Sequence, residues 1–227
     1  VISPAKAEVL VNQAGYDTGA PKTFVVQAGF RAEQARFAVV DAGGAAVFEG
    51  DLPAPERITG FYGHDWGFFY QRGDLSSVDA PGTYRVRVTL DGVTAESHPF
   101  EIGPERLWQA TARPAYRFFW YQRCGMAIPG FHGACHLDDS STPGGACPDL
   151  AGGWHDAGDY NKYHNAPYVY GLGWAYERAQ ALFDADDQDG NGRGDFLDEL
   201  AWGGDHARRM IAPDGSVYGP MSRGYGF

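Results

Sequence analysis

Apolar and polar residues alternate in short runs along the first hundred or so positions. The clearest run is YRVRVTL at 84–90, in which every second residue is apolar. A period of two is that of a strand with one buried face. The next dipeptide, Asp91-Gly92, is favoured in tight hairpin turns. The pattern therefore predicts a strand over 84–90 that turns back into another strand.

Similar runs recur through the rest of this region. Further strands are expected over 8–12, 23–28, 36–41, 46–49, 66–72 and 93–102. About seven short strands in roughly a hundred residues, separated by turn residues, are typical of an immunoglobulin-like β-sandwich. We therefore expect a sandwich domain over residues 1–103.

The hydrophobic period changes after Gly103-Pro104. The strand is expected to end at the glycine, and proline suits the first turn of a helix. Residues 105–122 show a helical pattern that contains Pro114, where we expect a kink. Apolar residues at helical spacing between Val169 and Phe183 predict a second helix.

A third helix is expected over 195–211. Its inward-facing positions are predicted to be Leu197, Leu200, Ala201, Gly204 and Ile211. The faces of these helices are broad and aromatic, which indicates packing against further helices. We therefore expect a helical domain over residues 104–227.

Composition and charge narrow the kinds of partner. The chain of 227 residues has a formal net charge of −11 and no basic stripe, which excludes nucleic acid. No run of about eighteen apolar residues is present, so no membrane partner is expected. The segment 1–4 also lacks the features of a signal peptide, so the protein is either cytosolic or separated from its signal. The 6 Trp, 13 Tyr and 14 Phe suit a surface that binds flat, hydroxylated rings.

The densest chemistry lies at 152–163, where the sequence is GGWHDAGDYNKY. Asp156 and Asp159 are three residues apart between glycines, which let the backbone turn tightly and approach a ligand. The two carboxylates could aim at one water molecule while neighbouring rings stack on sugar faces. This arrangement favours sugar cleavage. The alternative is an ordinary Asx turn beside a buried aromatic cluster.

The 3 cysteines lie close together in a segment that is also rich in histidine. An odd, clustered number of cysteines mixed with histidine is more typical of metal binding than of a disulfide framework. A disulfide with one spare thiol is the alternative. The residues concerned are Cys124, Cys135, Cys147, His132, His136 and His155.

An acidic loop with the sequence DQDGNGRGDFLD occupies 187–198. It has oxygen-bearing residues at positions one, three, five and nine and glycine at position six, as in an EF-hand-type calcium loop. Its last position holds aspartate where such loops have glutamate. The predicted calcium ligands are Asp187, Asp189, Asn191, Asp195 and Asp198. The alternative is a solvated acidic turn in which Asp195 caps the third helix.

Two specific motifs occur together in this chain, one at the start of the sandwich and one in the helical region. VNQAGY at 11–16 opens the sandwich, and GWHDAGDY at 153–160 follows in the helical region, with Cys124-Gly125 and Cys135-His136 between them. This combination resembles the family 9 glycoside hydrolases, specifically the endoglucanases with an N-terminal immunoglobulin-like domain. The likeness extends over essentially the whole chain but covers only part of the family's length. It implies that residues 104–227 form the first part of an (α/α)6 barrel.

The resemblance implies a secreted enzyme that hydrolyses β-1,4-glucosidic bonds of cellulose or related β-glucans with inversion. In such enzymes one carboxylate activates a water molecule while a carboxylic acid protonates the leaving oxygen. Asp159 matches the family's general base, and Asp156 matches the partner that holds the water.

The family's general acid is a glutamate near the end of the catalytic domain, and no residue here matches it. Glu177 and Glu199 lie on expected helices, as surface or loop-supporting residues. We therefore expect the chain alone to be inactive, with the rest of the barrel supplied by a second polypeptide or a longer precursor. Robust turnover of carboxymethylcellulose by the isolated chain would refute this expectation.

The resemblance points to Cys124, Cys135, His136 and His155 as zinc ligands. Two thiolates and two imidazoles suit tetrahedral zinc in a closed structural site, with no position left for a substrate water. Cys147 is a competing ligand. Family members also carry an acidic loop in the corresponding place, and several bind calcium.

Three rings are candidates for contact with the glucan: Trp154, Tyr160 and Tyr225. Aromatic residues in helical regions more often form core, which is the alternative for this set. Three other functions remain open: an exo-acting enzyme on cello-oligosaccharides, an amino-sugar glycosidase of the same family, and a non-catalytic carbohydrate-binding fragment. Product profiling on long cellulose separates the first of these from an endoglucanase.

Overall fold

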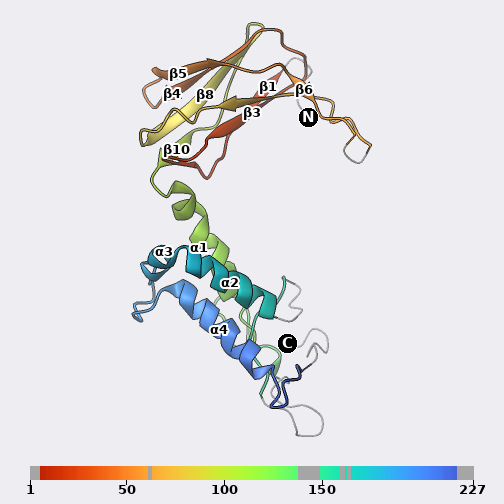
Figure 1. Cartoon of the computed structure of the whole chain (residues 1–227), viewed down its shortest axis with the longest axis vertical. Helices are drawn as coiled ribbons and strands as arrows, with labels where there is room; N and C mark the ends of the chain where they lie inside the picture. The colour runs from red at the N-terminus through yellow and green to blue at the C-terminus, as the bar shows by residue number, and fades with distance from the viewer. Residues whose placement is uncertain (1–5, 61–62, 138–148, 159–161, 163–164, 219–227) are drawn as a thin grey trace. The chain divides into compact units, whose positions relative to one another are not determined.

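The computed structural model describes residues 6–60, 63–137, 149–158, 162 and 165–218. The chain divides into two compact units, Val1–Arg113 and Pro114–Phe227. Figure 1 shows strands in the first unit and, apart from the beginning of the first helix, helices in the second. None of the helices in the described ranges combines the length and the apolar character needed to cross a membrane.

The first unit contains two β-sheets (Figure 1). One has the order β1 (Ala7–Leu10), β3 (Thr23–Ala28), β7 (Phe69–Asp74) and β6 (Glu56–Arg57). The other has the order β2 (Tyr16–Asp17), β10 (Phe100–Gly103), β8 (Gly82–Leu90), β4 (Ala35–Asp41) and β5 (Ala46–Asp51), with β9 (Val93–Glu96) paired to β8. The strand pairs are antiparallel except β2–β10. The predicted immunoglobulin-like sandwich is confirmed.

The core of the sandwich follows from the alternation seen in the sequence. β8 buries Tyr84, Val86, Val88 and Leu90 on one face and exposes the residues between them. Across the core, Phe24 of β3 meets Phe37 of β4 edge to face, with ring centroids 5.0 Å apart. The Tyr84 hydroxyl donates to the Ala80 carbonyl over 2.9 Å, a bond of the tyrosine-corner kind found in such sandwiches.

Two details of the strands differ from the prediction. The single strand expected over 93–102 is divided into β9 and β10. The division falls at Ser97-His98-Pro99, where proline has no N–H for the ladder. The two-residue strands β2 and β6 were not predicted, because segments so short carry no periodic signal.

The helices are α1 (Arg106–Tyr121), α2 (Ala166–Arg178), α3 (Gln180–Asp184) and α4 (Asp195–Arg209). α1 runs continuously through Pro114. The second predicted helix is interrupted at Ala179, whose φ of −143° and ψ of 37° are not helical, so it becomes α2 and α3.

The first turn of α1 belongs to the sandwich unit. The Leu107 N–H donates to Asp17 Oδ1 over 2.8 Å, and Arg106 pairs with Glu101 at 2.8 Å. Two residues of the sandwich therefore hold the beginning of the helix. These contacts agree with the division into compact units, in which the beginning of α1 belongs to the first unit although the strands end at Gly103.

The predicted inward face of α4 is wrong by about one residue. The helix buries Phe196, Glu199, Gly203 and His206, whereas the predicted inward residue Ile211 is 57% exposed. Phe196 stacks on Phe183 of α3 with ring centroids 3.7 Å apart, which fixes the rotation of the helix. The remaining inward positions include a glutamate and a histidine, which an apolar pattern does not select.

Candidate active site and metal centres

The GGWHD segment is held by the chain that leaves α1. The Cys124 N–H donates to the Gly153 carbonyl over 2.9 Å, and the His155 N–H donates to the Gln122 carbonyl over 2.8 Å. This antiparallel bridge places residues 122–124 alongside 153–155. It explains how Cys124 and His155, far apart in sequence, reach the same place.

The glycines of this segment are required by close packing. Gly153 has a φ of 71°, and a Cβ built on it would lie 1.9 Å from Asn165 Oδ1 and 2.7 Å from His206 Nδ1. Because glycine has no Cβ in this space, the Asn165 side chain can approach and bond the backbone of Trp154. Its oxygen accepts from the Trp154 N–H over 2.8 Å, and its nitrogen donates to the Trp154 carbonyl over 3.2 Å.

Trp154 is a core residue, which corrects the expectation that its ring contacts sugar. The side chain is 0% exposed. Its ring meets Phe119 edge to face at 5.1 Å, and its tip occupies the space beside Gly203. No face of the ring is left for stacking on a pyranose. The other two candidate rings, Tyr160 and Tyr225, lie outside the described residues.

The four predicted zinc ligands come together. One ligand atom each from Cys124, Cys135, His136 and His155 lies within 4.8 Å of the others, and all four residues are buried. Cys135 Sγ is 3.2 Å from His155 Nε2. Within the described ranges no disulfide joins Cys124 to Cys135, so the disulfide alternative does not apply to this pair. The competing ligand Cys147 lies outside the described residues.

The chemistry of this cluster suits a metal ion. The hydrogen bond with Cys124 lowers the pKa of the Cys135 thiol to about 3, with burial opposing and the bonds to His155 and His136 adding to the effect. A thiolate is the form that binds zinc. Zinc bonds of about 2.0–2.3 Å place tetrahedral ligands roughly 3.3–3.8 Å apart, so the group has the right size.

Backbone strain accompanies the cluster. His136 has a φ of 50°, in the left-handed region. This conformation costs a non-glycine residue about 1–2 kcal/mol. Its neighbours must therefore hold it in place, as is common where a strained backbone serves a site.

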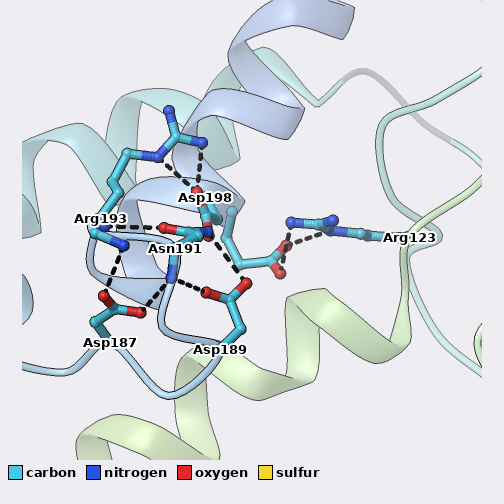
Figure 2. A network of polar contacts seen from close by, with 8 residues as sticks. Arg123, Asp187, Asp189, Asn191, Arg193 and Asp198 are labelled. Carbon is cyan, nitrogen blue, oxygen red and sulfur yellow. Dashed lines mark hydrogen bonds and ion pairs between the residues drawn. The ribbon is translucent and has the colours of Figure 1, made fainter.

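The acidic loop before α4 is closed on itself by hydrogen bonds (Figure 2). Carboxylate oxygens of Asp187, Asp189 and Asp195 lie within 4.8 Å of one another. The Asn191 N–H donates to Asp187 over 3.2 Å and to Asp189 over 3.0 Å. Three of the predicted calcium ligands are therefore gathered, with Asn191 bonded to two of them.

The fifth predicted ligand, Asp198, lies in a different arrangement. It forms an ion pair with Arg193 and accepts a bond from Asn191 Nδ2 over 2.7 Å (Figure 2). In this structure a guanidinium therefore neutralises the carboxylate, and Asp198 is not part of the group of three. The alternative role of Asp195 as a helix cap is not seen either, because the N-cap of α4 is Gly194 and makes no side-chain cap bond.

Asp156 follows the metal-ligand candidate His155 directly and is half-buried. Its Oδ1 atom is buried and has no hydrogen-bond partner within the described residues. A buried acceptor without a donor is costly, by about 1–3 kcal/mol, unless water or a ligand supplies one. Its expected partner Asp159 lies outside the described residues.

The structure shows an interaction that the sequence does not predict, between Arg123 and Glu199. The guanidinium Nη2 is 3.1 Å from Oε1, and Nε donates to Oε2 over 3.2 Å. Burial raises the pKa of Glu199, and attraction to Arg123 opposes the rise. Glu199 is 3% exposed, so the expectation of a surface residue is wrong and that of a loop-supporting one fits. No hydrophobic pattern could have revealed a buried ion pair.

Comparison with known proteins gives the context of this site. The cellulase N-terminal ig-like domain matches residues 5–93, and glycosyl hydrolase family 9 matches residues 108–225. The cellodextrinase of Butyrivibrio fibrisolvens is 31% identical over 172 residues, which are 71% of this chain and 28% of that protein. Endoglucanase D of Acetivibrio thermocellus is 31% identical over 197 residues, which are 79% of this chain and 30% of that protein.

A third relative is the xyloglucan-specific endo-beta-1,4-glucanase of Bacteroides ovatus. It is 31% identical over 168 residues, which are 64% of this chain and 28% of that protein. The chain thus spans less than a third of the length of these curated relatives. The family match at 108–225 takes in just over half of the 227 residues, and it includes the GGWHD segment, the cysteine–histidine cluster and the acidic loop. The chain therefore belongs to glycosyl hydrolase family 9.

Proposed function

We propose that the whole protein is an endo-β-1,4-glucanase that cleaves β-glucans with inversion. In this proposal Asp159 takes the proton of the attacking water, and Asp156 orients that water. Inverting hydrolysis needs a base on one face of the sugar and an acid on the other, roughly 6.5–9.5 Å away. The acid is assigned to a glutamate elsewhere in the whole protein, because no residue of this chain matches it.

The observation that supports this role most directly is the buried Oδ1 atom of Asp156, which has no donor among the described residues. The segment that carries it is fixed by the backbone bonds of Gly153 and His155. A carboxylate held in this way can accept a hydrogen bond from a water molecule and set its direction. Preorganised geometry of this kind lowers the barrier because little reorganisation is needed.

The proposal includes a structural zinc ion held by Cys124, Cys135, His136 and His155. The four ligand atoms are buried and close together, and Cys135 is acidic enough to bind as a thiolate. Four protein ligands would complete the coordination, so the ion would supply rigidity and charge compensation rather than a reactive water. Because His155 precedes Asp156, the same four residues would anchor the catalytic segment.

The acidic loop is the proposed calcium site. The carboxylates of Asp187, Asp189 and Asp195 provide the hard oxygen ligands that calcium prefers, and Asn191 lies among them. Asp198 would join them only if its pair with Arg193 opened. The loop leads directly into α4, so an ion there would steady the start of that helix.

The proposed substrate is a neutral glucan, and the proposed location is extracellular. A net charge of −11 disfavours polyanionic polymers. The names of the relatives include a cellodextrinase and two endoglucanases. Whether cleavage occurs within the glucan polymer or at its ends therefore needs a direct measurement. A fall in viscosity of a soluble glucan before reducing ends accumulate would identify endo action.

The test uses the whole protein with Asp159→Asn and, separately, Asp156→Asn. We expect kcat on carboxymethylcellulose to fall by about 10²–10⁴-fold for Asp159→Asn, which is the range for a lost general base, and by less for Asp156→Asn. The matched control is Asp214→Asn, at an exposed aspartate of the same unit. Unchanged hydrolysis by a folded Asp159→Asn variant would end the proposal, as would a product of retained anomeric configuration.

A further inference from the structure

Glu199 lies in the second turn of α4, next to the acidic loop, and its carboxylate is buried. It makes three directed contacts with residues distant in sequence. Two are with the Arg123 guanidinium, at 3.1 and 3.2 Å. The third is with the Trp154 indole, whose Nε1–H donates to Oε2 over 3.2 Å. One carboxylate thus holds both partners of the Arg123–Trp154 backbone bridge.

Arg123 is itself fixed on both sides. Its guanidinium carbon is 4.5 Å from the ring centroid of Trp120 and 4.8 Å from that of Trp202. Contacts of a guanidinium with aromatic faces are favourable, and more so away from water. These two contacts restrict how far Arg123 can follow if the Glu199 carboxylate moves, so the fork of the arginine favours one position of the carboxylate.

A second residue of α4 holds the same segment. The Trp202 indole donates to the Gly153 carbonyl over 2.8 Å, while Asn165 bonds the backbone of Trp154. Glu199 and Trp202 are three residues apart, so they lie on one face of the helix. The position of Gly153-Trp154 is thus set by α4, and Asp156 follows two residues later.

The neighbour of Glu199 points into the acidic loop instead. Asp198 pairs with Arg193, and Figure 2 shows Arg193 and Arg123 on opposite sides of the start of α4. Successive residues of this helix therefore connect the loop on one side with the GGWHD segment on the other. A displacement of α4 at the loop would reach Trp154 through Glu199.

We infer that Glu199 is a positioning residue for the reaction proposed above: by holding Trp154 and Arg123 it sets the direction in which Asp156 projects. This inference rests on the proposed role of Asp156. Stability alone explains the pair poorly, because a buried ion pair is often no more stabilising than the apolar side chains that could replace it. Directed bonds from one carboxylate to both sides of the Arg123–Trp154 bridge are what orientation requires.

The test compares Glu199→Gln with Glu177→Gln, the same change at an exposed position of α2. Amide exchange, followed by mass spectrometry, is expected to be at least tenfold faster at 153–156 in Glu199→Gln and unchanged in the control. The indole N–H resonance of Trp154 should also move. In the whole protein we expect kcat to fall roughly tenfold to a hundredfold, with KM within twofold of the original value.

A second variant, Trp154→Phe, keeps the ion pair and removes the indole donor together with the ring tip beside Gly203. Unchanged exchange in it decides against the inference even if Glu199→Gln does not fold. Unchanged exchange at 153–156 in a folded variant overturns the inference. Faster exchange with an unchanged kcat overturns it as well. If the whole protein hydrolyses no β-glucan in any form, the proposed function fails. The exchange and the indole resonance then still decide whether Glu199 orders the segment.

Discussion

The side chains buried in the sandwich differ in kind from those buried in the helical unit. In the described part of the sandwich the buried polar residues are Lys22, Gln71 and Ser97, beside an extensive apolar core. In the described part of the helical unit they are Gln122, Arg123, His136, His155, Lys162, Asn165, Glu199 and His206. Buried polar groups stabilise a fold only when their partners are present. The sandwich should therefore be stable by itself, whereas the helical unit should depend on ions and pH.

Removal of the proposed zinc should give the largest difference in stability between the two units. Structural zinc can contribute about 10–16 kcal/mol in small domains, so Cys135→Ser or a strong chelator should abolish or greatly lower the unfolding transition of the helical unit. The transition of the sandwich should stay where it is. Differential scanning calorimetry with zinc added back measures both. Two transitions that move together, or neither moving, would contradict the distinction between the units.

The complementary change is Phe24→Ala in the sandwich core. Loss of a buried phenylalanine costs about 3–5 kcal/mol, because apolar contacts are lost and a cavity remains. Here the ring packs against Phe37 and fills the space beside Gly73. Chemical denaturation monitored by amide exchange should show the lower free energy of unfolding in the sandwich, while amides of the helices stay protected. Val47→Ala, at an exposed position, is the control.

A pH effect is expected in the helical unit from His206. Burial, and then the charges of Lys162 and Arg209, lower the pKa of His206 to about 4. The unfolded chain takes up this proton near pH 6.5 and the folded chain does not. The contribution of neutral His206 to the free energy of unfolding is therefore fully present above that pH. It falls by roughly 3 kcal/mol as the pH drops from 6.5 to 4. His206→Gln should flatten this slope in urea titrations at several pH values; an equally steep slope would show that another group is responsible.

The smallest effect on stability should come from the exposed ion pair of Arg87 on β8 and Glu96 on β9. Arg87 Nε is 2.7 Å from Glu96 Oε1. Exposed pairs contribute about 0.2–1 kcal/mol. Arg87→Ala should therefore change the free energy of unfolding by less than about 1 kcal/mol. Arg123→Ala leaves Glu199 buried without its charge partner and should cost about 3–5 kcal/mol. Similar losses for the two variants would show that burial makes no difference here.

The contrast also explains what the sequence could and could not predict. β8 was predictable because its alternating residues are buried against other apolar side chains. The rotation of α4 was not, because Glu199 and His206 face inward through polar partners that the local sequence does not name. The break at Ala179 has no glycine or proline to announce it. The candidate metal ligands could be predicted, because clustered cysteine and histidine and the EF-hand-type spacing of the acidic loop indicate such residues, and the family resemblance selected four of the first group. Trp154 lies in a segment with no period to predict its burial.

The bond from the Leu107 N–H to Asp17 crosses ninety positions of the chain. It supplies a first-turn amide of α1 with an acceptor from β2, which forms only when β10 is in place beside it. The helix therefore gains this acceptor only once β2 has paired with β10, the strand directly before α1 in the chain. Exchanging the sandwich for an unrelated module at Gly103 would discard that acceptor, and a grafted module would need its own carboxylate in the place of Asp17.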